Sequence, residues 1–121
     1  MIKLSRAEDA PTLKGPGDGR TKVLIDSQVG AKNLSLCWIK FPVGGKSDLH
    51  TRDVEECVYV IKGRTVVVSG HERVEFGEGD AVFIQAGVEH YHENIGPSEL
   101  EQIVVFSPQG PESILRDLPL E

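Results

Sequence analysis

Short apolar runs separated by turn residues recur along most of this chain. The runs are rich in Val, Ile and aromatic residues, and none continues with the period of about 3.6 residues that an amphipathic helix requires. Glycine turns such as Lys62-Gly63, Ser69-Gly70 and Ala86-Gly87 separate them. The pattern predicts an antiparallel all-β sandwich or barrel. The predicted strands cover residues 23–25, 34–41, 57–61, 65–68, 73–76, 81–84, 90–93 and 102–106.

Several of these runs are apolar at every position instead of at alternate positions, as in 57–61, 66–68 and 103–106. A strand with one face in water alternates between apolar and polar residues, so these strands are predicted to be covered on both faces. One face would line the barrel, and the other would pack on a second sheet or on a second copy of the chain. We therefore expect a homodimer.

The two ends of the chain depart from this pattern. Residues 1–20 are irregular and contain the breaker cluster Gly15-Pro16-Gly17-Asp18-Gly19, which predicts an N-terminal arm. Residues 21–121 are then expected to form a single domain, as the length of 121 residues suggests. Near the C-terminus, the spacing of Ile114, Leu115 and Leu118 predicts one short helical turn that is stable only when docked.

Charge and composition narrow the classes of partner. The net charge of −6 and the absence of any run of basic residues argue against nucleic-acid or anionic-membrane binding. No apolar span reaches the length of about 18 residues needed to cross a bilayer, so a soluble cytoplasmic protein is expected. Cys37 and Cys57 lie inside apolar runs, which favours two buried thiols over a disulfide.

Residues capable of metal binding gather in two stretches. On an unbroken strand His50, Arg52 and Glu56 would share one face, because successive side chains alternate. His90 and His92 also share a face, about 7 Å apart along the strand. His71, the remaining histidine, lies in a predicted hairpin turn and is expected to face solvent.

The two stretches resemble the paired motifs of the cupin superfamily, and together they span residues 44–94. The spacings agree throughout, but Arg52 stands where the family has a second histidine, and Gln85 stands where it has proline. The resemblance implies an antiparallel double-stranded β-helix, the jelly-roll or cupin barrel. The first motif maps onto Gly44, His50, Arg52, Glu56 and Gly63, and the second onto Gly79, Gln85, Gly87, His90 and Asn94.

The resemblance further implies one divalent metal inside the barrel, usually iron, manganese, nickel, copper or zinc. Carried over by position, the ligands are His50, Glu56 and His90. Arginine is permanently protonated and has no lone pair to donate, so Arg52 cannot be a ligand. Two imidazoles and one carboxylate resemble the facial triad of non-haem iron oxygenases, which leaves coordination positions open.

Two further residues have more than one interpretation. Arg52 either turns to the rim, binds an anionic group of a ligand through its planar guanidinium, or pairs with Glu56 in a site without metal. His92 is either a substitute ligand, a polar residue of the cavity able to act as an acid or base, or a structural histidine. We assign catalytic roles to both: Arg52 neutralises substrate charge and His92 moves protons.

These assignments lead to two hypotheses from different classes. The first is a small metal-dependent enzyme, similar to a dioxygenase or a related lyase or isomerase, acting on a small polar and acidic molecule. The second is a non-catalytic cupin that binds a sugar or another metabolite, with or without metal. The fold cannot separate them, because this barrel serves many activities.

Overall fold

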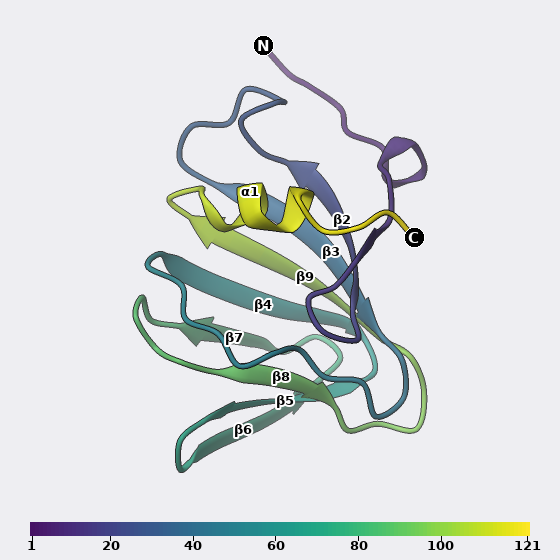
Figure 1. Cartoon of the computed structure of the whole chain (residues 1–121), viewed down its shortest axis with the longest axis vertical. Coiled ribbons are helices and arrows are strands. Elements are labelled where there is room, and N and C mark those ends of the chain that lie inside the picture. The colour runs from purple at the N-terminus through teal and green to yellow at the C-terminus, as the bar shows by residue number, and fades with distance from the viewer.

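The protein folds into two antiparallel sheets (Figure 1). The structure is a computed structural model, and it describes residues 1–121 except for the side chains of 112–114. The larger sheet has the strand order β1-β2-β3-β9-β4-β7, and the smaller has the order β6-β5-β8. The strands are β1 (Leu13–Lys14), β2 (Arg20–Ile25), β3 (Ser35–Phe41), β4 (Glu55–Lys62), β5 (Arg64–Ser69), β6 (Glu72–Gly77), β7 (Ala81–Ile84), β8 (Tyr91–Asn94) and β9 (Leu100–Ser107).

The predicted strands are confirmed, with differences of a few residues at their ends, and the architecture is the expected jelly roll. Glycine is required at the tight turn between β4 and β5. Gly63 has φ +98°, and a Cβ there would lie 3.1 Å from both the carbonyl oxygen of Glu99 and the Cα of Leu100. A larger residue would therefore be strained as well as crowded. The turn carries the chain from β4, which holds Glu56 in the larger sheet, to β5 in the smaller sheet.

Both sheets contribute alternate side chains to one core. Val58 on β4 and Val104 on β9 are opposite each other in register and are fully buried, and Val67 from the smaller sheet packs in the same cluster. Two polar side chains continue these inward-facing rows. Glu56 precedes Val58 by two residues, and Gln102 precedes Val104 by two residues. Both are nearly fully buried, so the fold places polar groups inside an otherwise apolar barrel.

Burial on both faces is found for β5 but not for β4. Val66 and Val67, adjacent on β5, are both buried. On β4, in contrast, Cys57 is exposed and Tyr59 keeps 48% of its surface accessible. The predicted burial of the Cys57 thiol is therefore wrong, because Cys57 has the parity of the outer face. Cys37, which is buried, lies on the inner face of the same sheet.

The C-terminal segment forms the predicted turn of helix, α1 (Pro111–Arg116), which lies against β2 and β3. Leu115 is buried in the core, and Arg116 forms an ion pair with the buried carboxylate of Asp26. The predicted contribution of Ile114 lies outside the described side chains. The helix is too short to be stable alone, so these two contacts hold it in place.

The predicted arm has structure of its own. A 3-10 turn, η1 (Ala7–Asp9), precedes β1, whose residues Leu13 and Lys14 pair with Thr21 and Arg20 at the edge of the larger sheet. The cluster 15–19 forms the turn between β1 and β2. In the described part of the chain, no helix has both the length and the apolar character that crossing a membrane would need.

Candidate metal centre

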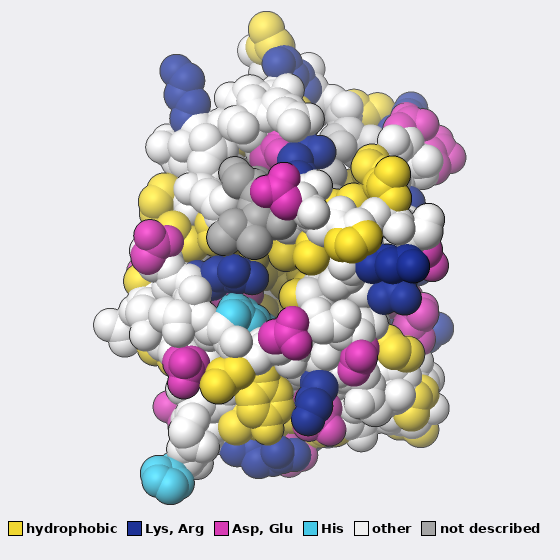
Figure 2. Space-filling view, in the orientation of Figure 1, with side chains coloured by type: hydrophobic (Ala, Val, Ile, Leu, Met, Phe, Trp, Pro, Cys, Tyr) yellow, Lys and Arg dark blue, Asp and Glu magenta, His cyan; other side chains and the backbone are white. Residues whose placement is uncertain are grey.

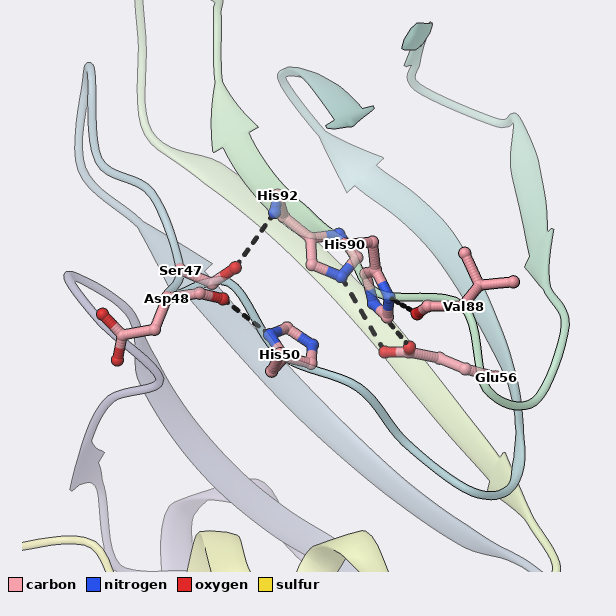
Figure 3. A network of polar contacts seen from close by, with 7 residues as sticks. All are labelled: Ser47, Asp48, His50, Glu56, Val88, His90 and His92. Atoms are coloured by element: carbon pink, nitrogen blue, oxygen red, sulfur yellow. Dashed lines mark hydrogen bonds and ion pairs between the residues drawn. The ribbon is translucent and has the colours of Figure 1, made fainter. Parts of the chain in front are cut away.

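The two motif stretches meet through a pair of backbone hydrogen bonds. The amide of His50 donates to the carbonyl of His90 at 2.9 Å, and the amide of His90 donates to the carbonyl of His50 at 2.8 Å. His50 lies in the loop before β4 instead of on a continuous strand, and His90 immediately precedes β8. Their side chains point toward Glu56 on β4 (Figure 3). This pairing brings distant segments of the sequence to one point in the barrel.

Four side chains form a cluster with the geometry of a metal site. The ligand atoms of His50, Glu56, His90 and His92 all lie within 4.8 Å of one another. Glu56, His90 and His92 are buried, and His50 is half-buried at the edge. His92 therefore lies together with the three predicted ligands. It comes from the second motif stretch, whereas the histidine that the family has in its first motif is replaced by Arg52 in this chain.

Backbone carbonyls fix the tautomers of two of the histidines. The Nδ1 of His50 lies 2.7 Å from the carbonyl oxygen of Asp48, and the Nδ1 of His90 lies 2.8 Å from that of Val88. A carbonyl only accepts hydrogen bonds, so each Nδ1 carries the hydrogen and each Nε2 of a neutral ring keeps its lone pair. Outer partners of this kind orient metal-binding histidines.

The lone pairs converge on the carboxylate of Glu56. The Nε2 of His90 lies 3.1 Å from Oε2, and the Nε2 of His92 lies 3.9 Å from Oε1. With neutral rings, acceptor atoms face each other in a buried space, and His90 Nε2 and Glu56 Oε2 have no satisfying hydrogen bond among the described residues. A cation between them would resolve this conflict. The donor set of imidazole nitrogens and carboxylate oxygen suits a divalent transition metal.

The pKa values of the cluster follow from burial and from this carboxylate. Burial raises the pKa of Glu56, but the hydrogen bond that His90 donates when its Nε2 is protonated, together with the attraction of the surrounding imidazoles, outweighs it, and the net shift is downward. Burial lowers the pKa of His90, but Glu56 reverses this and raises it. Burial lowers the pKa of His50 and brings the pKa of His92 down to about 4. A proton shared with Glu56 is thus best held at His90 when no metal is present.

Arg52 lies beside the cluster and makes no ion pair with Glu56 within the described structure. Its Nε is buried without a hydrogen-bond partner, and the residue as a whole is half-buried. Its own carbonyl accepts the amide of Gly87 at 2.8 Å, which ties the His50 loop to the turn before His90. Figure 2 shows a hollow on this side of the molecule, with histidine and basic side chains at its edge.

A small cavity continues from the cluster into the barrel. His50, Arg52, Glu56 and His92 line one part of it, and Gln102 and Leu115 are among the residues that line the rest. Its free volume of about 10 Å³ suits roughly one water molecule. Gln102 was not singled out in the sequence because it begins an apolar run. Its shared parity with Val104 and Phe106 was the available signal that it faces inward.

A family model described as Cupin domain matches residues 37–106. The chain belongs to the cupin family. This cupin is 38% identical over 109 residues to an uncharacterised protein of Methanocaldococcus jannaschii, covering 89% of this chain and 87% of that one. The resemblance expected from the two motifs is therefore confirmed.

Solved structures show the same fold. The polyketide cyclase RemF from Streptomyces resistomycificus superposes with a TM-score of 0.79 at 25% identity, over 92% of this cupin and 82% of that chain. A predicted oxalate decarboxylase from Thermotoga maritima superposes with a TM-score of 0.74 at 23% identity, over 88% of this cupin and all of that chain (100%). The neighbours of this cupin thus include enzymes that act on small molecules.

Proposed function

We propose that this cupin is a metal-dependent enzyme, with dioxygenase-like or related lyase or isomerase chemistry on a small polar, acidic molecule. The observation that carries the proposal is the approach of two buried acceptors, His90 Nε2 and Glu56 Oε2, to 3.1 Å. Buried polar groups are nearly always hydrogen-bonded, so such an arrangement has a cost unless a metal ion, or a proton on His90, lies between the two atoms. The same two atoms would be natural metal ligands.

His50, Glu56 and His90 would hold the ion, and His92 would supply a fourth donor. The sequence alone suggested that His92 moves protons, but its place within the ligand cluster supports a role as ligand instead. Iron, manganese, nickel, copper and zinc all accept nitrogen and oxygen ligands of this kind. When bound, such an ion supplies Lewis acidity or, if redox-active, the capacity to activate oxygen.

Arg52 would bind and orient an anionic group of the substrate. Its guanidinium is always charged, and its planar arrangement of donors matches a carboxylate. The buried, unpartnered Nε of Arg52 supports this role, since a solvated rim arginine would expose that atom. The absence of an ion pair with Glu56 in the described structure leaves Arg52 available for a ligand.

Metal analysis tests the proposal directly. Protein purified without added metal should contain close to one transition metal ion per chain, and His50→Ala and His90→Ala should lose it. His71→Ala is the matched control, because His71 is exposed in the turn between β5 and β6. If the wild-type protein carries no such metal and cannot be loaded with any, the enzyme hypothesis fails. A non-catalytic cupin that binds a sugar or metabolite would then be the better account.

We also propose that two copies associate through the outer face of the larger sheet. Tyr59, Ile61 and Phe83 keep 48%, 46% and 58% of their surfaces exposed there. Cys57 lies between Phe83 and Val105 in register, so the apolar positions are contiguous. Tyr59 and Phe83 alone leave about 200 Å² accessible, given about 150–250 Å² for a whole aromatic side chain. Apolar patches larger than a few hundred Å² mark interaction sites, and the exposed Ile61 and Cys57 enlarge this one.

A cytoplasmic location is the last part of the proposal. The thiol of Cys57, which forms no disulfide, supports it, since disulfides form in oxidising compartments and are rare in the cytoplasm. Cell fractionation with an antibody to the protein would test it, and recovery from an oxidising compartment would contradict it.

A further inference from the structure

The three histidines of the candidate metal centre are not held in the same way. His50 and His90 each direct Nδ1 at the carbonyl two residues earlier. For His92 the corresponding carbonyl belongs to His90, and that carbonyl accepts the backbone amide of His50. The Nδ1 of His92 is buried and has no hydrogen-bond partner among the described residues. Its ring therefore lacks the direct support that the other two rings have.

Gln102 carries a buried hydrogen-bond acceptor that also lacks a partner among the described residues. Its side chain is 1% exposed, and its Oε1 has no hydrogen-bond partner among the described residues. It is opposite Ile39 on β3 and Val60 on β4, so its neighbours across the sheet are apolar. A buried amide oxygen without a partner is costly, and a leucine in this row would avoid that cost. Its presence calls for a partner inside the barrel.

One cavity beside the metal centre connects these two residues. His92 and Gln102 both line it, and its free volume of about 10 Å³ suits roughly one water molecule. A buried water needs at least two polar partners. The Nδ1–H of His92 would donate to such a water, and the water would donate to Oε1 of Gln102. Arg52, whose Nε is also buried and unpartnered, lines the same space.

We infer that Gln102 is a positioning residue of the metal centre, acting on His92 through one buried water. This relay fixes the hydrogen of His92 on Nδ1 and leaves the lone pair on Nε2. The Nε2 atom lies on the side of the ring that faces Glu56, 3.9 Å from Oε1 of that residue. Gln102 thus does for His92 what the carbonyls of Asp48 and Val88 do for the other two histidines. The inference rests on the proposed metal site.

The test compares metal affinity in two substitutions of Gln102. Gln102→Leu removes the acceptor while keeping a side chain that suits its apolar neighbours, and it should weaken metal binding about 10–100-fold, the usual effect of losing an outer partner. Gln102→Glu keeps an acceptor and should bind metal within about threefold of wild type. Ser35→Ala is the control, because Ser35 is also buried and unpartnered but does not line the cavity. It should leave the affinity unchanged.

A second readout uses the metal-free protein. ¹⁵N NMR of wild type should show His92 with its hydrogen on Nδ1, and a crystal structure should show one water between His92 and Gln102. Gln102→Leu should lose both signatures. A wild-type protein that binds metal while Gln102→Leu binds it equally tightly would overturn the inference and leave the proposed function intact. A wild-type protein that binds no metal would overturn the proposed function. The contact between Gln102 and His92 would then be tested only by the NMR tautomer and the crystallographic water, and the absence of both would refute it.

Discussion

The Nε2 of His90 lies 3.1 Å from Oε2 of Glu56, in a place where both side chains are almost completely buried. The hydrogen bond from Nδ1 of His90 to the carbonyl of Val88 makes this approach informative. Because Nδ1 already carries the hydrogen of the neutral ring, Nε2 either directs its lone pair at the carboxylate of Glu56 or binds an additional proton. A metal ion and a proton therefore compete for one position, and metal affinity should fall as the solution becomes more acidic.

The metal-free protein should lose stability in acid because of His92. The folded pKa of His92 is about 4, below its ordinary value of 6.5. Between these values the unfolded chain binds a proton at His92 that the folded chain does not bind. The contribution of His92 to the free energy of unfolding should therefore fall by about 3 kcal/mol as the pH drops from about 6.5 to 4. Urea titrations at several pH values measure this.

The comparison with His92→Phe isolates the effect. His90 has a raised pKa and contributes in the opposite direction, with stability lost as pH rises through its folded pKa. Subtracting the two pH profiles removes that contribution. An unchanged acid slope in His92→Phe would contradict the assignment to His92.

Arg52 should control the affinity for small anions without controlling metal content. In metal-loaded protein, Arg52→Leu should weaken binding of malonate at least tenfold. Arg52→Lys should show a smaller loss, because a lysine keeps the charge but not the two-pronged donor geometry. Isothermal titration calorimetry gives the affinities, with metal content measured on the same samples. Equal malonate affinity in all three proteins would refute the role.

Charge on the outer sheet face should dissociate the dimer. Tyr59→Glu combined with Phe83→Glu places charges of the same sign, without partners, in the proposed interface and should convert the protein to a monomer in sedimentation velocity experiments. Val74→Lys is the control, because Val74 is an exposed apolar residue at 37% on the smaller sheet. In the wild type, Cys57 should react slowly with a bulky maleimide, and the double substitution should speed this reaction. A wild-type monomer would end the proposal.

The ion pair that anchors α1 should matter more than a surface pair. Arg116→Gln leaves the buried Asp26 carboxylate without its charged partner and should lower the free energy of unfolding by about 3 kcal/mol. Arg20→Gln breaks the exposed pair with Glu121, whose closest atoms are 3.9 Å apart, and should cost less than about 1 kcal/mol. Denaturant unfolding measures both. Equal effects would show that burial of Asp26 does not determine the energy.

Local patterns in the sequence, together with the spacing of the two motifs, were enough to predict the strands, the turns and three of the four clustered donors. Strand periodicity and glycine turns are local properties, so the strand that carries Glu56 and the turn at Gly63 could be read directly. The spacing of two motifs then brought His50, Glu56 and His90 together by resemblance to the cupin family, which the comparison confirms.

Packing between the sheets was needed to establish which face of the all-apolar strands is covered and which atoms each buried polar group contacts. An all-apolar run such as 57–61 carries no signal of its inner face, so the exposure of Cys57 followed from the packing of the two sheets. The unpartnered atoms of His92 and Gln102 depend on contacts between strands far apart in sequence. Hydrogen-bond satisfaction is a property of three-dimensional surroundings, and no local pattern specifies it.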